Sequence, residues 1–219
     1  MQATAKGFFI HRRAYSTKAN ILTFFTFEHG TFDFLYFASR KSPALIPFSQ
    51  YEIEYNEKAN FRSVVRFSLV HPANNWHANP NKLAIAYFIA DVVNQTTQIN
   101  NQDSSAYHAL LLVEALLTKE MDAFYIPFEF LNLWMEVLGI LPEAVKQANS
   151  FDISEGLFLT ETQTVDIAAI TWNEILQKKP VEDKIALKHC FSLMINYMAI
   201  HVPNFNVTAT LTILKQIFS

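Results

Sequence analysis

The stretch Ile21–Phe37 reads ILTFFTFEHGTFDFLYF, and its pattern decides what kind of fold the chain adopts. Aromatic and β-branched residues fill both halves of the stretch, which is typical of β-strands. In the second half, positions 32, 34 and 36 are all aromatic, so one face of that strand is wholly aromatic. Between the halves lies Glu28-His29-Gly30, where the glycine can adopt the positive φ that a tight turn requires. The stretch therefore predicts a β-hairpin.

Three further stretches have the same strand-like composition, with turn-prone residues between them: Gly7–Arg13, Phe48–Tyr55 and Phe61–Val70. Asn56-Glu57-Lys58 can form the turn of a second hairpin. Five short strands without an insert of helical length favour a small closed barrel, of which the five-stranded OB-fold is the commonest kind. We therefore expect an OB-type β-barrel over residues 1–78.

From about residue 81 the apolar residues recur at helical spacing. The clearest case is Phe128–Leu138, which has Pro127 at its expected start and Gly139 just past its end, the usual boundaries of one helix. Further helices are expected around residues 83–90 and 107–117, and over Thr164–Gln177, Val181–Ile200 and Thr208–Phe218. The predicted fold class is α+β, with an α-helical domain over residues 79–219 joined to the barrel by a hinge at residues 71–81.

Charge is distributed unevenly along the chain, although the net charge is only −3. Residues 1–80 contain nine Lys or Arg and five Asp or Glu, whereas the rest of the chain contains eight and fifteen. A basic first part and an acidic second part suggest that only the first part meets a polyanion. The alternative is that the first part carries an ordinary solvated surface.

Nucleic-acid contacts are therefore expected from the barrel. OB-folds bind nucleic acids with basic side chains, which neutralise phosphates, and with aromatic rings, on which bases stack. The basic candidates fall in or next to the first and third inter-strand regions: Arg12, Arg13, Lys18, Arg40 and Lys41. The candidates for base stacking are Tyr15, Tyr36 and Phe37. The alternative for each aromatic residue is a place in the barrel core or in the contact between the barrel and the helices.

Catalytic, metal and membrane functions lack the residues that they need. The chain contains no P-loop, dinucleotide fingerprint, G-x-S-x-G or H-E-x-x-H motif, so we expect no catalytic site and no cofactor. His71 and His77 have no evident third metal ligand, and Cys190 is the single cysteine, so no metal is expected and a reducing cytoplasm suits the chain. No apolar run approaches the ~20 residues that span a bilayer, and the N-terminus does not resemble a signal peptide.

Several strings, in this order and spacing, resemble the RecO family. They cover nearly the whole chain: Lys6–Ile10 with Tyr15-Ser16, Phe25-Thr26 with His29-Gly30, the basic pair Arg40-Lys41, Ile46-Pro47-Phe48, Phe128–Glu143 (FEFLNLWMEVLGILPE), Phe151-Asp152 with Glu155-Gly156 and Phe158, and Tyr197–Phe218. The resemblance lies in the series, because no single string is diagnostic.

This resemblance implies a recombinational-repair mediator in the cytoplasm, associated with the nucleoid. Such a protein binds single- and double-stranded DNA, anneals strands, and works with RecR and the C-terminal tail of single-strand binding protein so that recombinase can load. Many members of the family hold zinc with four cysteines after the LGxP stretch, but residues 144–150 contain none. Because the chain is mildly acidic, the alternative is a protein-only adaptor that keeps the fold but binds DNA negligibly.

Overall fold

The computed structural model describes residues 2–37, 44–58, 61–72, 75–162 and 164–217. The chain forms two compact units. The first comprises residues up to Pro127 together with Val207–Ile217, and the second comprises Phe128–Asn206.

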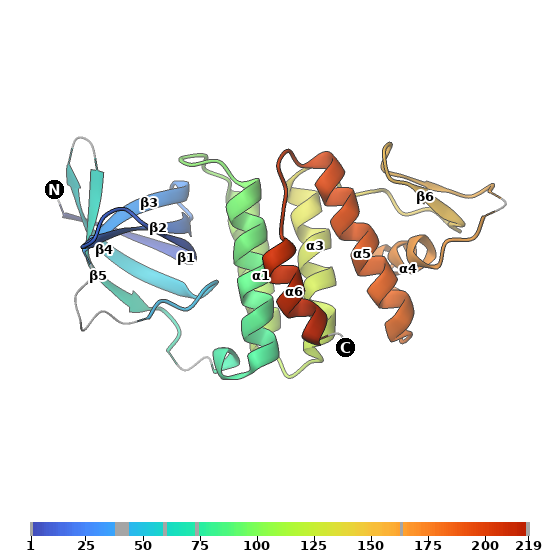
Figure 1. The fold of residues 1–219 in the computed structure, drawn as a ribbon, viewed down its shortest axis with the longest axis horizontal. Helices are drawn as coiled ribbons and strands as arrows, with labels where there is room; N and C mark the ends of the chain where they lie inside the picture. The colour runs from blue at the N-terminus through green and yellow to red at the C-terminus, as the bar shows by residue number, and fades with distance from the viewer. Residues whose placement is uncertain (1, 38–43, 59–60, 73–74, 163, 218–219) are drawn as a thin grey trace. The chain divides into compact units, whose positions relative to one another are not determined.

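Five strands form a closed barrel in the first unit, which confirms the predicted fold class (Figure 1). The strands are β1 (Gln2–Ala14), β2 (Ala19–Thr26), β3 (Gly30–Phe37), β4 (Gln50–Lys58) and β5 (Phe61–Leu69). Their order around the barrel is β1-β2-β3-β5-β4, and β1 pairs with β4 to close the ring. All neighbours are antiparallel except β3 and β5, which pair in parallel at Leu35 and Ser63. The predicted strands and the OB-type barrel are thus present.

Aromatic side chains fill the barrel, as their number in the sequence suggests. Phe24 and Phe34 lie at the centre with their ring centroids 5.8 Å apart in an edge-on arrangement, which aromatic pairs favour over face-to-face stacking. Around them lie Ala5, Phe9, Leu22, Phe32, Tyr51, Ile53 and Tyr55. Because side chains alternate along a strand, Phe8 points away from this core. The centroid of its ring lies 5.0 Å from that of Phe48, on which it stacks, and 5.6 Å from that of Tyr107. Phe8 therefore joins the barrel to the helices.

The predicted hairpin turn is confirmed, and Gly30 is required there for two reasons. Its φ of +62° lies in the left-handed region, which side chains with a Cβ disfavour. A Cβ at this position would also lie 1.8 Å from the backbone oxygen of Asn101. The loop that carries Asn101 runs along the start of β3, where the backbone N–H of Asn100 donates to the oxygen of Thr31 at 2.8 Å. This loop therefore extends the wall of the barrel beside β3.

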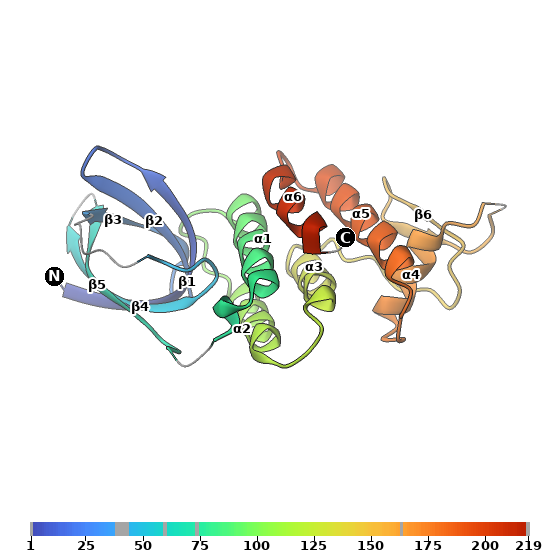
Figure 2. The same cartoon turned by 60° about the horizontal axis from the view of Figure 1, so that its bottom comes forward.

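Three helices complete the first unit: α1 (Pro80–Thr96), α2 (Ser104–Thr118) and α6 (Thr208–Ile217), with the short 3-10 turns η1 (Trp76–Ala78) and η2 (Ala123–Tyr125). α1 packs on β1, and α6 lies beside α1 (Figures 1 and 2). The hydroxyl of Thr210 on α6 donates to the carboxylate of Asp91 on α1 at 2.7 Å. The helices expected near residues 83–90, 107–117 and 208–218 are confirmed.

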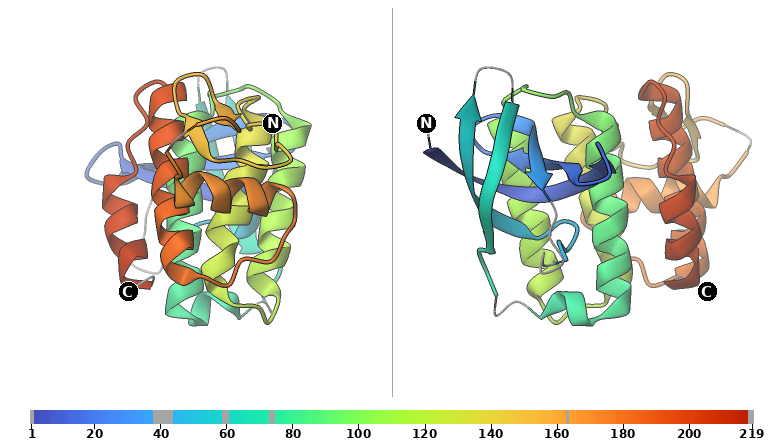
Figure 3. Two further views of the ribbon diagram at one scale, coloured as in Figure 1. Left: turned by 90° about the vertical axis from the view of Figure 1, so that its right-hand side faces the viewer. Right: turned by 60° about the vertical axis from the view of Figure 1, so that its left-hand side comes forward.

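The second unit contains the rest of α3 (Ile126–Val137), then α4 (Ile167–Leu176), α5 (Lys184–His201) and a small hairpin of β6 (Ser150–Asp152) and β7 (Leu157–Leu159). α4 packs against α5 and against β6 (Figure 3, left). α3 begins one residue before Pro127 and ends before Gly139, whose φ is +70°. The predicted helices are confirmed, whereas the hairpin was not predicted.

Candidate nucleic-acid interface

The strand register brings most of the candidate residues to one end of the barrel. Arg13 at the end of β1 pairs with Ile21 at the start of β2, which pairs with Leu35 near the end of β3. A tight turn joins β1 to β2, in which the N–H groups of Tyr15 and Ser16 both lie 3.0 Å from the oxygen of Ala19. We call this end of the barrel the β1–β3 rim, and it consists of Arg12, Arg13, Tyr15, Lys18, Tyr36 and Phe37.

The three aromatic residues of the rim differ in exposure. The side chains of Tyr15 and Phe37 are 67% and 60% exposed, so both offer a ring face to a base. Tyr36 is only partly exposed and packs against the barrel core, where its ring lies edge-on to that of Phe67 at 5.4 Å. Tyr15 and Phe37 are therefore the better placed of the three for stacking.

Arg12 and Arg13 are neighbours in the sequence but point to opposite sides of β1, because side chains alternate along a strand. Arg12 lines a cleft of about 500 Å³ that also contains Tyr87 and Asp91 of α1 and Thr210 of α6. Its Nε donates to Oδ1 of Asn20 at 3.1 Å. Within the described residues, no carboxylate lies within ion-pair distance of Arg12 or Lys18.

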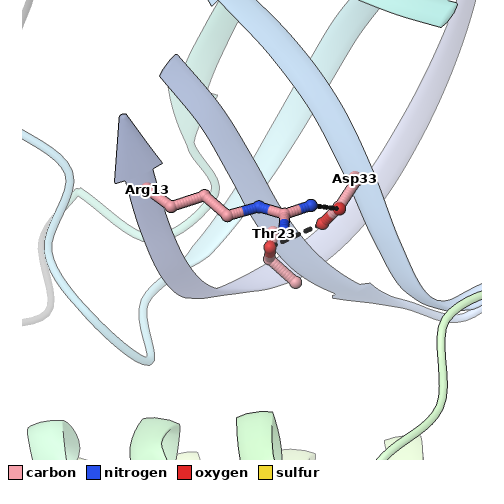
Figure 4. Close-up of polar contacts among 3 residues, drawn as sticks. All are labelled: Arg13, Thr23 and Asp33. Carbon is pink, nitrogen blue, oxygen red and sulfur yellow. Dashed lines mark hydrogen bonds and ion pairs between the residues drawn. The ribbon is translucent and has the colours of Figure 1, made fainter. Parts of the chain in front are cut away.

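Arg13 turns to the outer face of the barrel and is bound there by a carboxylate (Figure 4). Its Nη2 lies 2.6 Å from Oδ2 of Asp33, and the hydroxyl of Thr23 donates to Oδ1 of the same carboxylate at 2.6 Å. Asp33 thus uses one oxygen for a cation of β1 and the other for a hydroxyl of β2. The guanidinium of Arg13 is already neutralised before any polyanion arrives.

A second cleft, of about 530 Å³, lies on this outer face of β2 and β3. It is lined by Tyr15, Ile21, Asp33, Phe34, Leu35, Arg62, Ile99 and Asn100. The face of strands 2 and 3, with the adjoining loops, is where OB-folds bind oligonucleotides. We call this cleft the β2–β3 cleft.

Arg62 is a cleft residue that the sequence did not single out. It lies on β5, and it reaches the β2–β3 cleft only because β5 pairs with β3 to close the barrel. Its guanidinium carbon lies 3.9 Å from the centroid of the Phe32 ring, and its Nε lies 3.0 Å from Oε1 of Glu57. The only sign of it in the sequence was Glu57, five residues earlier. The turn expected at residues 56–58 is wrong, because these residues belong to β4, where Glu57 pairs with Arg62 of β5.

Ion pairing also involves Arg66, whose Nη2 lies 2.5 Å from Oε1 of Glu54 on the neighbouring strand. Together with the pairs of Arg13 and Arg62, this pair interrupts the positive charge along the barrel. Arg40 and Lys41, the remaining basic candidates, lie outside the described residues.

Side chains that could hold a metal do not gather in the described part of the chain, where no three His, Cys, Asp or Glu residues approach one another suitably. His71 and His77 line one small cavity with Glu114. Cys190 is fully buried in α5, and burial raises the pKa of its thiol, with a smaller contribution from the negative charge of Asp166. This thiol is therefore unsuited to ligation or nucleophilic attack. Among the helices described, none has the length and apolarity needed to cross a membrane.

Comparison with known proteins agrees with the resemblance seen in the sequence. No family model matches the chain. DNA repair protein RecO from Phocaeicola vulgatus is 22% identical to it over 246 aligned residues, which cover 97% of this chain and 98% of that protein. The aligned residues therefore include both the barrel and the helices. The chain is therefore a distant relative of DNA repair protein RecO along nearly its whole length.

Proposed function

We propose that the protein is a RecO-like mediator of recombinational DNA repair that binds DNA and partner proteins without catalysing a reaction. The observation that carries this proposal is the similarity to a DNA repair protein RecO over 97% of the chain. The closed five-stranded barrel supports it, because OB-folds commonly bind oligonucleotides.

In this proposal the two predicted domains divide the work. The barrel, residues 1–78, binds single- and double-stranded DNA and promotes annealing. The helical part, residues 79–219, binds a RecR-like protein and the C-terminal tail of single-strand binding protein, and so helps to load recombinase. The protein works in the cytoplasm, associated with the nucleoid.

DNA binding to the barrel combines charge and stacking. Lys18 and Arg12 have no acidic partner among the described residues, so they can neutralise phosphates without losing an ion pair. Tyr15 and Phe37 offer exposed rings to successive bases, and stacking of this kind tolerates any sequence. Arg13, Arg40 and Lys41 are further phosphate contacts, and Tyr36 is the third candidate for stacking.

The second candidate function is a protein-only adaptor. The specific observation in its favour is that three arginines of the barrel are paired with carboxylates, so the positive surface is discontinuous. The net charge of −3 points the same way. A measurement of DNA binding separates the two functions.

The test is the binding of a labelled single-stranded oligonucleotide, followed by fluorescence anisotropy from low to moderate salt. Each phosphate contact with a single strand contributes a slope of roughly 0.7 in log K against log salt. We expect Arg12→Ala with Lys18→Ala, and separately Arg40→Ala with Lys41→Ala, to weaken binding for all sequences and to lower the slope by roughly 1–1.5.

Lys146→Ala with Lys179→Ala is the matched control, because it removes the same charge from exposed positions of the second unit. This control should leave both the affinity and the slope close to those of the parent. A parent that binds no oligonucleotide even at low salt would favour the adaptor, whereas equal losses in all three double variants would point to net charge alone.

A further inference from the structure

We propose that Asp33 is a built-in competitor for the DNA phosphate, which holds Arg13 until a nucleic acid displaces it. This inference rests on the proposed function and specifies how the β2–β3 cleft is controlled. Asp33 then limits the affinity for DNA, because its carboxylate competes with the phosphate for Arg13.

The geometry of the Arg13–Asp33 pair resembles that of an arginine bound to a phosphate. The carboxylate offers one oxygen to the guanidinium at 2.6 Å and the other to the hydroxyl of Thr23 at 2.6 Å (Figure 4). Arginine binds carboxylates and phosphates with the same planar set of N–H donors. A phosphate that enters the cleft can therefore take the place that Asp33 occupies on Arg13.

The position of the pair is unusual for a simple cross-strand contact. Thr23 of β2 pairs with Asp33 on β3 and with His11 on β1. The β1 residue in the same row of the sheet as Asp33 is therefore His11, not Arg13. Arg13 instead reaches diagonally across β2 to the carboxylate. The carboxylate that it reaches belongs to the β2–β3 cleft, because Asp33 lines this cleft together with Tyr15 and Arg62.

The exchange is feasible because the pair is accessible to solvent. The side chains of Arg13 and Asp33 are 53% and 22% exposed, and ion pairs at such positions are weak because water screens them. A phosphate that displaces the carboxylate therefore breaks a weak contact and forms one of the same kind. The remaining negative charge of Asp33 stays beside the phosphate and opposes binding.

The decisive variant is Asp33→Asn, which keeps the shape of the side chain and an acceptor for Thr23 but removes the charge. We expect it to bind the single-stranded oligonucleotide roughly three- to tenfold more tightly at low salt, with a slope steeper by roughly 0.7, because the displaced negative charge of Asp33 no longer offsets the contact between Arg13 and the phosphate. Adding Arg13→Ala to Asp33→Asn should abolish the gain. Because the pair lies near the surface, circular dichroism should show that both variants remain folded.

Glu54→Gln is the matched control, since it releases Arg66 on β5 and changes the net charge by the same amount. We expect it to raise the affinity less than twofold. If the parent binds and Asp33→Asn binds no more tightly, the inference is wrong and the proposed function stands. An equal gain from Glu54→Gln would also overturn it, because net charge would then explain the result. If neither the parent nor Asp33→Asn binds, both the inference and the proposed function fail, whereas binding by Asp33→Asn alone supports the inference and favours the adaptor as the function of the parent.

Discussion

At the scale of the residue, the least expected group in the first unit is Glu114. This carboxyl lies on α2 and is only 7% exposed, in a small cavity that Gln50, His71 and His77 also line. Burial raises the pKa of Glu114 to about 7, and the positive charge of Lys6 lowers it only in part. The neutral, protonated carboxyl is therefore the form that suits the cavity.

The consequence is a dependence of stability on pH. Because the pKa of Glu114 is higher in the folded than in the unfolded protein, its ionisation lowers the free energy of unfolding as the pH rises from about 4.5 to about 7. We expect Glu114→Gln to match the parent near pH 5 and to exceed it at pH 8 by about 1–3 kcal/mol, after allowance for solvent screening. Urea unfolding at several pH values measures the difference.

Glu120→Gln provides the comparison, because it removes a carboxylate that is exposed just beyond the same helix. Its unfolding free energy should follow that of the parent across the pH range. A difference between Glu114→Gln and the parent that does not change with pH would mean that the cavity does not disfavour the carboxylate.

Single residues also show what the sequence could not reveal about the candidate site. The sequence does indicate that Tyr15 is exposed and that the β1–β3 rim is basic, because short polar turns join the aromatic strands. The separation of Arg12 from Arg13 onto opposite faces follows from strand alternation once β1 is known to extend to Ala14. The Arg13–Asp33 pair could not be predicted, because it depends on the register of three strands.

At the scale of the element, capping residues fix where several of the helices begin. Asp103, Asp166 and Asp183 each cap the N-terminus of a helix, accepting a hydrogen bond from a backbone N–H of the first turn. Burial of Asp103 opposes its ionisation, but hydrogen bonds from Ser105 and from the N–H of Ala106 outweigh this effect and lower the pKa. The charged cap is thus favoured in the folded state.

Removal of this cap should destabilise the protein. We expect Asp103→Ala to lower the free energy of unfolding by about 1 kcal/mol at pH 7, because an N–H of the first turn of α2 loses its acceptor. Asp103→Asn keeps an acceptor and should stay close to the parent. Since the folded pKa is lowered, the deficit of Asp103→Ala should shrink as the pH falls below the ordinary carboxyl range. Equal unfolding free energies for Asp103→Ala and the parent at pH 7 would contradict the capping role.

Long periodic elements could be predicted from the sequence, and short ones could not. Each barrel strand has at least eight residues, and each predicted helix has at least ten, so the apolar period is visible. β6 and β7 have three residues each, too few for a period to emerge. Aromatic contacts stabilise this hairpin, including those of Phe151 with Phe158 and Trp172 at 4.8 and 5.0 Å between ring centroids. Only the folded unit brings these rings together.

At the scale of the whole molecule, the barrel depends on helices that follow it in the sequence. Phe8 and Gln50 both contact Tyr107 of α2, the latter through a hydrogen bond of 2.8 Å. Gly30 abuts the loop between α1 and α2. These contacts are distant in sequence, so periodicity could indicate that the barrel would close but not which helices would cover it.

Limited proteolysis should reflect this dependence. We expect residues 71–81 to be cut slowly, because Trp76 is buried and η1 packs against α1. Fragments corresponding to a separate barrel and a separate helical part should not accumulate. Rapid cleavage there into two stable pieces, detected by mass spectrometry, would show that the barrel folds independently of the helices.

The return of the chain to its first unit has a consequence for biosynthesis. α6 packs on α1, but the ribosome makes it only after all of the second unit has been made. The nascent barrel and its first helices therefore lack one of their partners while residues 128–206 emerge and fold. A chain released early by a stalled ribosome would leave Asp91 without Thr210 and the side of α1 uncovered.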